Sequence, residues 1–461
     1  MQNKRIFWIL AMTLVVCLTS CHPKQEPESH KQDNAQSVLP IGVFDSGTGG
    51  LTVMERLLTI DEYNNTTGQY GADGIPDLNS ELFQYVGDQA NMPYGTYNAA
   101  NKSDLLRELI RRDAQFLIDT VFYNDPFETV PSGHKAPCKI IVIACNTATA
   151  YGMETVQEML KDVCPNVRVI GVIHAGVNAT LDKLAGKRKA SVGVLATVGT
   201  IDSGAYQEAL GNMASGYGIA DMNVVAQCGY GFAEAVDNEH DFVNSSLTAP
   251  RDSYKGPRLG NNDEDIKEYL MDVYNFEPEG LLIGTNGDIQ LNSAANYARF
   301  NLVSLVERHR LSGSTQPLNA VILGCTHYPF LLSTLQQVIR ELREYQHEGQ
   351  YIYRDLIADD FVFIDPAFYT AKECYVSLYN DDLLRQKGMN SLQTFISVPS
   401  ATLDPQYLDE DGKLTYDFKY GRTLDIQDLG TRFVPISDDN LGAENKQRIL
   451  NMLPATASYM F

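Results

Sequence analysis

The sequence is poor in cationic residues, and after its first twenty residues it has no long hydrophobic segment. It holds 36 lysines and arginines against 58 aspartates and glutamates, which gives a formal net charge of -22. Because nucleic-acid binding needs clustered lysine and arginine side chains to neutralise phosphates, we expect no nucleic-acid partner. No later stretch is apolar for long enough to cross a bilayer. We therefore expect the body of the 461-residue chain to be soluble and to form one or two large domains.

The sequence also lacks the short motifs that mark common cofactors and structural metals. It contains no GxGxxG fingerprint, no P-loop and no lysine in a pyridoxal-phosphate context. Its eight cysteines form no CxxC pair, and the six in the body are too sparse for a disulfide scaffold or a zinc site. The cluster Asp409-Glu410-Asp411 lacks the spacing of a calcium loop, so we interpret Asp411-Gly412 as a hairpin turn before a predicted strand over 414–426. We expect neither a cofactor nor a metal.

The N-terminal segment has the features of an exported lipoprotein. Two positive charges precede the apolar run Ile6–Val16, which has signal-peptide length. The tetrapeptide Leu18-Thr19-Ser20-Cys21 resembles the cleavage motif of bacterial lipoproteins. We expect residues 1–20 to be a signal peptide, Cys21 to carry lipid, and residues 21–39 to be a flexible tether. The protein would then be anchored at the periplasmic side of a bacterial membrane, in particular the outer membrane; an ordinary secretory signal is the alternative.

From residue 40 onwards, short apolar stretches alternate with stretches of helical spacing. This alternation is typical of βαβ units on a mainly parallel sheet. Three signals of the first half return in the same order in the second: residues 40–50 resemble 191–201, 141–149 resemble 321–329, and 167–176 resemble 361–371. The ordered repeat predicts an α/β fold of two related three-layer domains with mainly parallel sheets and an active site between them.

These patterns also suggest domain boundaries. We assign residues 40–190 to the first α/β domain and residues 191–384 to the second, which has a loop-like insert near residues 238–300. Residues 385–461 are a C-terminal extension, and we leave open that a part of it returns to the first domain.

Two cysteines, Cys145 and Cys325, follow apolar strands at equivalent places in the two halves. Ligands of open α/β sheets bind beyond the carboxyl ends of the strands. Each cysteine also precedes a predicted helix, whose N-terminal N–H groups favour a thiolate and lower the pKa of the thiol. If the two halves face each other, two activated sulfurs flank one site.

Two opposed acid–base groups suit the inversion of a carbon that bears a weakly acidic hydrogen. One thiolate removes the proton from one face, and the opposite thiol returns a proton to the other. The charge that develops on a substrate carboxylate needs fixed donors. Backbone N–H groups of the glycine turn and six polar side chains are the candidates: Ser46, Asn146, Thr147, Thr197, Thr200 and Thr326.

The two halves differ at residues that could tune the sulfurs. Asp45 would act as proton acceptor or orienter near Cys145, and His327 as the partner of Cys325. The structural alternatives are a helix N-cap for Asp45 and an ordinary hydrogen bond for His327. Structural roles are also expected for His174 and for the remaining body cysteines, Cys138, Cys164, Cys228 and Cys374.

Five segments in order resemble successive motifs of bacterial glutamate racemases, within the aspartate/glutamate racemase superfamily. They are "IGVFDSGTGGLTV", "GDQANMPYG", "IVIACNTATA", "GVLATVGTI" and "ILGCTHYPFLL". The resemblance implies an isomerase without pyridoxal phosphate that interconverts L- and D-glutamate, with Cys145 and Cys325 as catalytic pair. "CNT" with "CTH" favours glutamate over aspartate. The resemblance assigns substrate contacts to Asp45, Ser46, Pro93, Tyr94, Gly95, Cys145, Asn146, Thr147, Thr197, Thr200, Cys325, Thr326 and His327.

Some features depart from this family, whose members usually make D-glutamate for cell-wall precursors in the cytoplasm. This chain has the signal of an exported protein, inserts at 61–82 and 123–137, and an acidic helper, Glu234 or Asp237, in uncertain register. Two alternatives therefore stay open: a non-catalytic amino-acid-binding or sensory lipoprotein, and an isomerase of aspartate or another acidic compound. The sequence also leaves open whether two copies form a homodimer.

Overall fold

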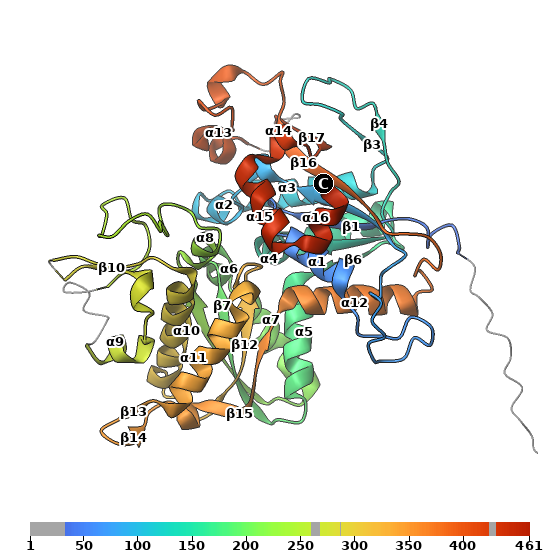
Figure 1. The fold of residues 1–461 in the computed structure, drawn as a ribbon. Helices are drawn as coiled ribbons and strands as arrows, with labels where there is room; N and C mark the ends of the chain where they lie inside the picture. The colour runs from blue at the N-terminus through green and yellow to red at the C-terminus, as the bar shows by residue number, and fades with distance from the viewer. Residues whose placement is uncertain (1–32, 260–267, 286, 424–429) are drawn as a thin grey trace, which may run out of the picture. The chain divides into compact units, whose positions relative to one another are not determined.

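The computed structural model describes residues 33–259, 268–285, 287–423 and 430–461 (Figure 1). The predicted signal peptide, Cys21 and most of the tether lie outside these residues. Among the residues that are described, no helix combines the length and the apolar character needed to cross a bilayer.

The first sheet has six strands in the order β17-β16-β2-β1-β5-β6. All neighbouring pairs are parallel except β16 and β17, which are antiparallel. Two strands of this sheet, β16 and β17, come from the C-terminal extension. The strands are β1 (Ile41–Asp45), β2 (Leu82–Gly87), β5 (Ile140–Ile143), β6 (Arg168–Gly171), β16 (Ser391–Pro399) and β17 (Thr431–Pro435).

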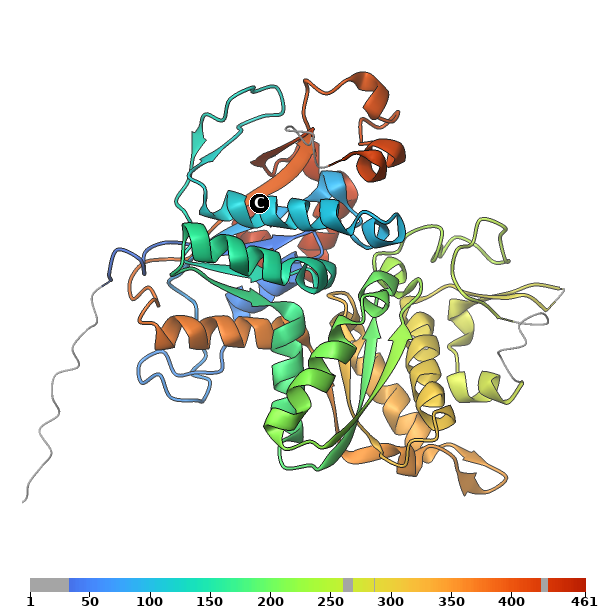
Figure 2. The same ribbon diagram turned by 180° about the vertical axis from the view of Figure 1, so that it is seen from behind.

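Helices cover both faces of this sheet, as expected for parallel strands that are buried on both sides. Side chains of β5 alternate between two cores: Ile140 and Val142 pack with α1, α12, α15 and α16, and Ile141 and Ile143 pack with α3 and α4. Figures 1 and 2 show these two helical layers from opposite sides. The helices are α1 (Leu51–Thr59), α3 (Ser103–Ile118), α4 (Asn146–Val163), α12 (Pro366–Asn380), α15 (Ala443–Met452) and α16 (Pro454–Met460).

The second sheet has four parallel strands in the order β15-β12-β7-β8. Counted along the chain within each sheet, the first four strands of both sheets lie side by side in the order second, first, third, fourth. This shared order agrees with the sequence repeat, and the predicted α/β class with mainly parallel sheets is confirmed. The strands are β7 (Lys189–Ala196), β8 (Asp221–Cys228), β12 (Leu318–Gly324) and β15 (Ile357–Ile364).

The second sheet is also covered on both faces. Helices α10 and α11 pack with Leu195, Val321 and Leu323, and helices α5 and α7 pack against Val192 and Ile322. The helices of this half are α5 (Val172–Leu184), α6 (Val198–Asp202), α7 (Ala205–Met213), α8 (Phe232–Val236), α9 (Glu268–Tyr274), α10 (Ala294–Leu311) and α11 (Leu332–Glu344). Strand β6 ends at Gly171, and His174 lies half-buried in α5.

The inserts and loops add smaller elements. The insert near 238–300 forms a three-stranded antiparallel sheet, and two short ribbons lie in other loops. The elements are β9 (Arg258–Leu259), β10 (Leu281–Ile283) and β11 (Ile289–Leu291), β3 (Val121–Phe122) with β4 (Gly133–His134), β13 (Gln346–His347) with β14 (Gln350–Tyr351), and the helices α2 (Gly95–Ala99), α13 (Tyr416–Gly421) and α14 (Asp438–Leu441).

The predicted strand over 414–426 is wrong in its described part, because residues 416–421 form α13. The hydroxyl of Thr415 accepts the N–H of Phe418 and caps this helix, and both Phe418 and Tyr420 are buried. The turn at Asp411-Gly412 is present: Gly412 has φ +73°, and the N–H of Asp409 donates to the carbonyl of Lys413.

Candidate active site

Cys145 stands at the carboxyl end of β5 and forms the N-cap of α4. Its Sγ accepts the N–H of Ala148 at 3.4 Å and lies 3.7 Å from Ser46 Oγ. The residue is buried, with 7% of its surface exposed. The predicted position of the thiol at a strand end and a helix start is thus observed for this cysteine.

The predicted lowering of the pKa of Cys145 is not observed. Burial raises the pKa of this thiol to about 12, and the charge of Asp45 adds to the rise. The hydrogen bonds from Ala148 and Ser46 lower the pKa, but they do not outweigh desolvation. Without bound substrate, Cys145 is therefore a neutral thiol.

Asp45 holds the turn that leads into α1. Its Oδ2 accepts the N–H groups of Gly47 and Gly50, both at 3.0 Å. A Cβ atom on Gly50 would lie 2.5 Å from the Cβ of Asp45, so this position requires glycine. The predicted alternative, a helix N-cap, is not the role of Asp45, because the N-cap of α1 is Gly50; Asp45 instead holds the turn before it. The charge of Asp45 also acts on Cys145.

Cys325 stands at the carboxyl end of β12 and is buried, with 6% exposed. Its Sγ lies 3.5 Å from His327 Nδ1, which is also 3.4 Å from Thr326 Oγ1. A 3-10 turn over Tyr328–Leu331 separates this cysteine from α11. Cys325 thus precedes a turn into a helix, as predicted, and the side chain next to its sulfur is His327 rather than a helix terminus.

Asp237 completes a chain of three groups at the second cysteine. It follows α8, and its Oδ2 lies 3.1 Å from His327 Nε2. Burial opposes the charge of His327, but the Cys325 sulfur and Asp237 raise the pKa of His327 to about 10. Burial likewise opposes ionisation of Asp237, yet His327 and Arg448 lower its pKa. Of the two acidic helpers left open, Asp237 makes this contact with His327.

The two half-sites face each other. A Cβ atom on Gly49, in the turn after β1, would lie 3.4 Å from Thr326 Oγ1 and 3.6 Å from His327 Cε1. On the other side, the hydroxyl of Tyr206 on α7 donates to Asn146 Oδ1 at 2.8 Å. The polar turns after β1 and β5 are thus in contact with residues that follow β12 and β7.

The other predicted contact residues lie around these turns. Thr147 is buried in the first turn of α4, and Gly95 begins α2. A Cβ atom on Gly199 of α6 would lie 2.9 Å from the Cα of Gly95. Thr197 and Thr200 bond to each other at 3.1 Å, and Pro93 follows a cis peptide bond.

Tyr94 has its side chain in the interior. Its hydroxyl lies 2.6 Å from Asp88 Oδ2 and 2.7 Å from Asp113 Oδ2, and only 2% of the residue is exposed. A single hydroxyl proton cannot serve two carboxylates. Burial raises the pKa of Asp113 well above its ordinary value, so Asp113 carries the second proton. This network fixes the loop around Tyr94, and the phenol itself is engaged within it.

Arg448 is a site residue that the sequence did not reveal. It projects from α15 of the C-terminal extension, and its Nη1 lies 3.2 Å from Asp237 Oδ1 and 3.1 Å from His327 Nε2. Its Nη2 donates to Thr48 Oγ1 at 2.6 Å. Arg448 therefore contacts both half-sites.

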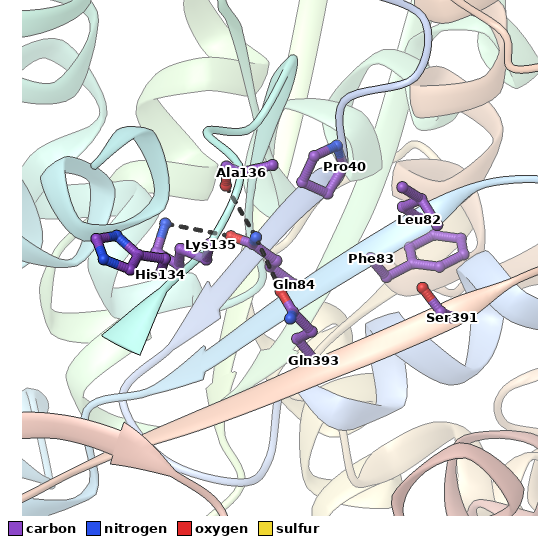
Figure 3. A pocket seen from close by; sticks show the side chains of 9 residues that line it. All are labelled: Pro40, Leu82, Phe83, Gln84, His134, Lys135, Ala136, Ser391 and Gln393. Carbon is purple, nitrogen blue, oxygen red and sulfur yellow. Dashed lines mark hydrogen bonds between the residues drawn. The ribbon is translucent and has the colours of Figure 1, made fainter. Parts of the chain in front are cut away.

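A pocket of about 400 Å³ lies at the opposite end of the first sheet, where its strands begin (Figure 3). Gln84 fills its centre: the amide donates to Gln393 and to the Ala136 carbonyl, and its oxygen accepts from Lys135. These polar groups satisfy one another. The lining residues are Pro40, Leu82, Phe83, Gln84, His134, Lys135, Ala136, Ser391 and Gln393.

Comparisons with known proteins show what the chain is similar to. The model of the Asp/Glu/Hydantoin racemase family matches residues 125–235, which include Cys145 and Thr197. The chain is 24% identical over 375 residues to a glutamate racemase of Levilactobacillus brevis, covering 80% of this chain and 91% of the relative. A glutamate racemase of Corynebacterium diphtheriae is 26% identical over 371 residues, with the same coverage. Over most of its length the chain is thus similar to glutamate racemases, and residues 125–235 match the Asp/Glu/Hydantoin racemase family.

Shorter and structural matches are of the same kind. A glutamate racemase of Lysinibacillus sphaericus (strain C3-41) is 36% identical over 171 residues, or 37% of this chain and 48% of the relative. Among solved structures, a glutamate racemase of Bacillus anthracis is 23% identical with a TM-score of 0.46, covering 78% of this chain and 88% of that chain.

Proposed function

We propose that the chain is a cofactor-independent amino-acid racemase that interconverts L- and D-glutamate. One observation carries the proposal: two buried cysteines follow equivalent strands, β5 and β12, and the turns around them face each other. The similarity to glutamate racemases of several species along most of the chain supports the same activity.

The two sulfurs have different neighbours, and this difference gives each a role. His327, whose pKa is raised to about 10, places an imidazolium 3.5 Å from the Cys325 sulfur, where a cation favours a thiolate. Cys145 is a neutral thiol, because burial raises its pKa to about 12. In one direction the Cα–H bond of the substrate breaks and its proton goes to the Cys325 sulfur, while a new C–H bond forms with the proton of Cys145. The protein then holds a thiol at 325 and a thiolate at 145, ready for the opposite enantiomer.

The negative charge that moves onto the substrate carboxylate needs fixed donors. Ser46, Asn146 and Thr326 lie next to the two sulfurs and can supply them. The amino end of α4 adds N–H groups that favour an anion at this place. Together these groups can stabilise the planar intermediate without a metal or a cofactor as electron sink.

Solvent deuterium exchange tests this proposal directly. L- and D-glutamate are incubated separately with the protein in deuterated water, and the α-proton is followed by NMR. Both enantiomers should exchange and interconvert. Cys145→Ser and Cys325→Ser should each abolish racemisation, while each variant retains exchange with one enantiomer. Absence of exchange with glutamate but exchange with aspartate would move the substrate to aspartate; binding of glutamate in calorimetry without any exchange would favour an amino-acid-binding protein.

We also propose that the racemase is exported and lipid-anchored through Cys21. The support is the sequence of residues 1–39, in which the apolar run ends in Leu18-Thr19-Ser20-Cys21. Palmitate labelling and membrane fractionation of the native chain and of Cys21→Ser test it. Labelling lost in the variant supports the anchor, and an unlabelled native chain in the soluble fraction overturns it.

A further inference from the structure

The C-terminal extension reaches two of the loops that surround the candidate site. From α13, Lys419 Nζ donates to the Met92 carbonyl at 2.9 Å, and Tyr420 lies 3.4 Å from the Pro93 carbonyl. From α15, Arg448 reaches the turn after β1 and the Cys325 half-site. The extension thus contacts the site from two separate helices, and of these contacts the one made by Arg448 brings a charge to the acid–base groups.

Arg448 is held in a fixed position by both neutral and charged partners. Its Nη2 donates to Thr48 Oγ1 at 2.6 Å and to Asn445 Oδ1 at 3.3 Å. Its Nη1 donates to Asp237 Oδ1 at 3.2 Å. The side chain is 17% exposed, so solvent screens these contacts only in part.

The Nε2 atom of His327 has two neighbours that require opposite protonation states. When protonated it donates to Asp237 Oδ2 at 3.1 Å, and when neutral it can accept the N–H of Arg448 Nη1, also at 3.1 Å. Asp237 keeps its bond from Arg448 in both cases. In both protonation states of His327, every buried polar atom of this cluster therefore has a hydrogen-bond partner, which avoids the free-energy cost of unpaired buried groups. Without Arg448, the Nε2 atom of His327 would have a partner only in the protonated state.

We propose that Arg448 is a positioning residue that lets His327 alternate between cation and neutral base while Cys325 alternates between thiolate and thiol. The proposal rests on the two-cysteine reaction proposed above. During turnover Cys325 gains a proton and loses its charge, so His327 loses one of the two anions that stabilise its cation. Arg448 then supplies the hydrogen bond that the neutral imidazole needs, and keeps Asp237 paired.

Among the residues that the structure describes, three charged or titratable groups contact His327 directly: Cys325, Asp237 and Arg448. Tyr328 lies next to Cys325, and burial raises its pKa well above its ordinary value, so it stays neutral. Two further carboxylates near this cluster are Glu234, which acts on Tyr328, and Glu239, which lies near Asp237. Neither carboxylate takes part in the His327–Arg448 contact.

The test replaces Arg448 by methionine, which keeps an unbranched apolar stem but removes the charge and the donors. We expect kcat to fall roughly 10- to 100-fold, a part of the effect of a well-placed acid or base. KM should fall with kcat for the enantiomer that reacts with the Cys325 thiolate, because that form accumulates. Arg448→Lys, which keeps the cation but not the fork, should recover part of the rate.

A second readout does not depend on racemisation. The rate at which iodoacetamide alkylates Cys325, followed by mass spectrometry against pH, reports the thiolate held by His327. In Arg448→Met the rise of the alkylation rate with pH should occur at higher pH than in the native chain, because loss of the nearby cation makes the Cys325–His327 pair hold its proton more tightly. Lys446→Met, two residues away on α15 and paired with exposed Asp438, is the matched control and should change neither readout.

The outcomes separate the two proposals. Native kcat together with an unchanged alkylation profile in Arg448→Met would overturn the role of Arg448. If Arg448→Met fails to fold, the comparison of Arg448→Lys with the native chain decides, and an identical alkylation profile there overturns it as well. A native chain without deuterium exchange would overturn the racemase function, whereas a shifted alkylation profile would still establish the coupling of Arg448 to His327.

Discussion

The hydroxyl of Tyr206, on a helix of the second half, donates a hydrogen bond of 2.8 Å to the side chain of Asn146, which follows the first cysteine. Tyr206 is fully buried, and burial raises its pKa, so the phenol remains a donor at every physiological pH. The contact fixes the orientation of Asn146 from across the site. An amide that must hold a substrate carboxylate needs this kind of support.

Tyr206→Phe should weaken substrate binding while leaving the chemistry of both sulfurs in place. A lost hydrogen bond of this type costs about 1 kcal/mol, which corresponds to roughly a fivefold rise in KM. Steady-state kinetics with both enantiomers measure the change. Tyr217→Phe, on a half-buried residue after α7, is the control. A native KM in Tyr206→Phe would show that Asn146 is not held for the substrate.

The His327–Asp237 pair should make stability depend on pH in a defined window. The pKa of His327 is raised from 6.5 to about 10, so the pair contributes its full stability below about pH 6.5. The contribution decreases above that pH and is lost as pH rises through about 10. The Tm difference between the native chain and Asp237→Asn should therefore shrink from pH 6 to pH 10.5. Asp438→Asn, at an exposed ion pair, should show a constant difference; a constant difference for Asp237→Asn would contradict the assigned pairing.

Gly50→Ala should disrupt the first turn of the site. The new Cβ would lie 2.5 Å from Asp45 Cβ and 2.9 Å from Ala144 Cβ, so the strand end beside Cys145 must shift. We expect lower stability and at least a tenfold loss of kcat. Gly211→Ala is the matched control, because nothing lies within 4 Å of its Cβ position on α7. There, alanine should stabilise the helix by about 0.5–1 kcal/mol. Equal melting temperatures of the two variants would contradict this account.

Lys139→Met should destabilise the chain strongly although it lies far from the site. Lys139 Nζ bonds to Glu81 Oε2 at 2.6 Å and to the carbonyls of Ser37 and Leu383, and both charged side chains are 1% exposed. Removing one partner of a buried pair leaves the other charge uncompensated, at a cost of about 3–5 kcal/mol. Urea denaturation measures it. The double variant Lys139→Met with Glu81→Gln should lose less; an equal or larger loss would show that the carboxylate is not the strained partner.

The sequence predicted the parts of the molecule that local patterns encode. The strands before Asp45, Cys145 and Cys325 are short apolar runs that end in polar turns, and the structure has a strand at each of them. The order of these signals in the two halves also agrees with the strand order of the two sheets. The sequence pattern was sufficient because parallel strands that are buried on both faces appear in a sequence as nearly continuous apolar runs.

Other features depend on contacts that no local pattern contains. Arg448 meets His327 across 121 positions of sequence, and it lies outside the repeated segments. The segment 414–426 alternates in polarity, but a capping hydroxyl at Thr415 favours a helix there. The pKa of Cys145 rises although the residue caps a helix, because burial and Asp45 outweigh the helix terminus. Each of these outcomes is decided by tertiary packing.

Strand β16 is parallel to β2 over the whole length from Leu82 to Gly87, so an interior position of the first sheet is filled by residues that are synthesised long after β2. Until β16 has been synthesised, one edge of β2 has unpaired backbone N–H and C=O groups. Such an open strand edge can pair with another chain and so promote aggregation. A protein shortened before residue 391 would keep that edge bare permanently. We expect such a protein to aggregate, so the role of residues 391–461 should be tested by single substitutions and not by deletion.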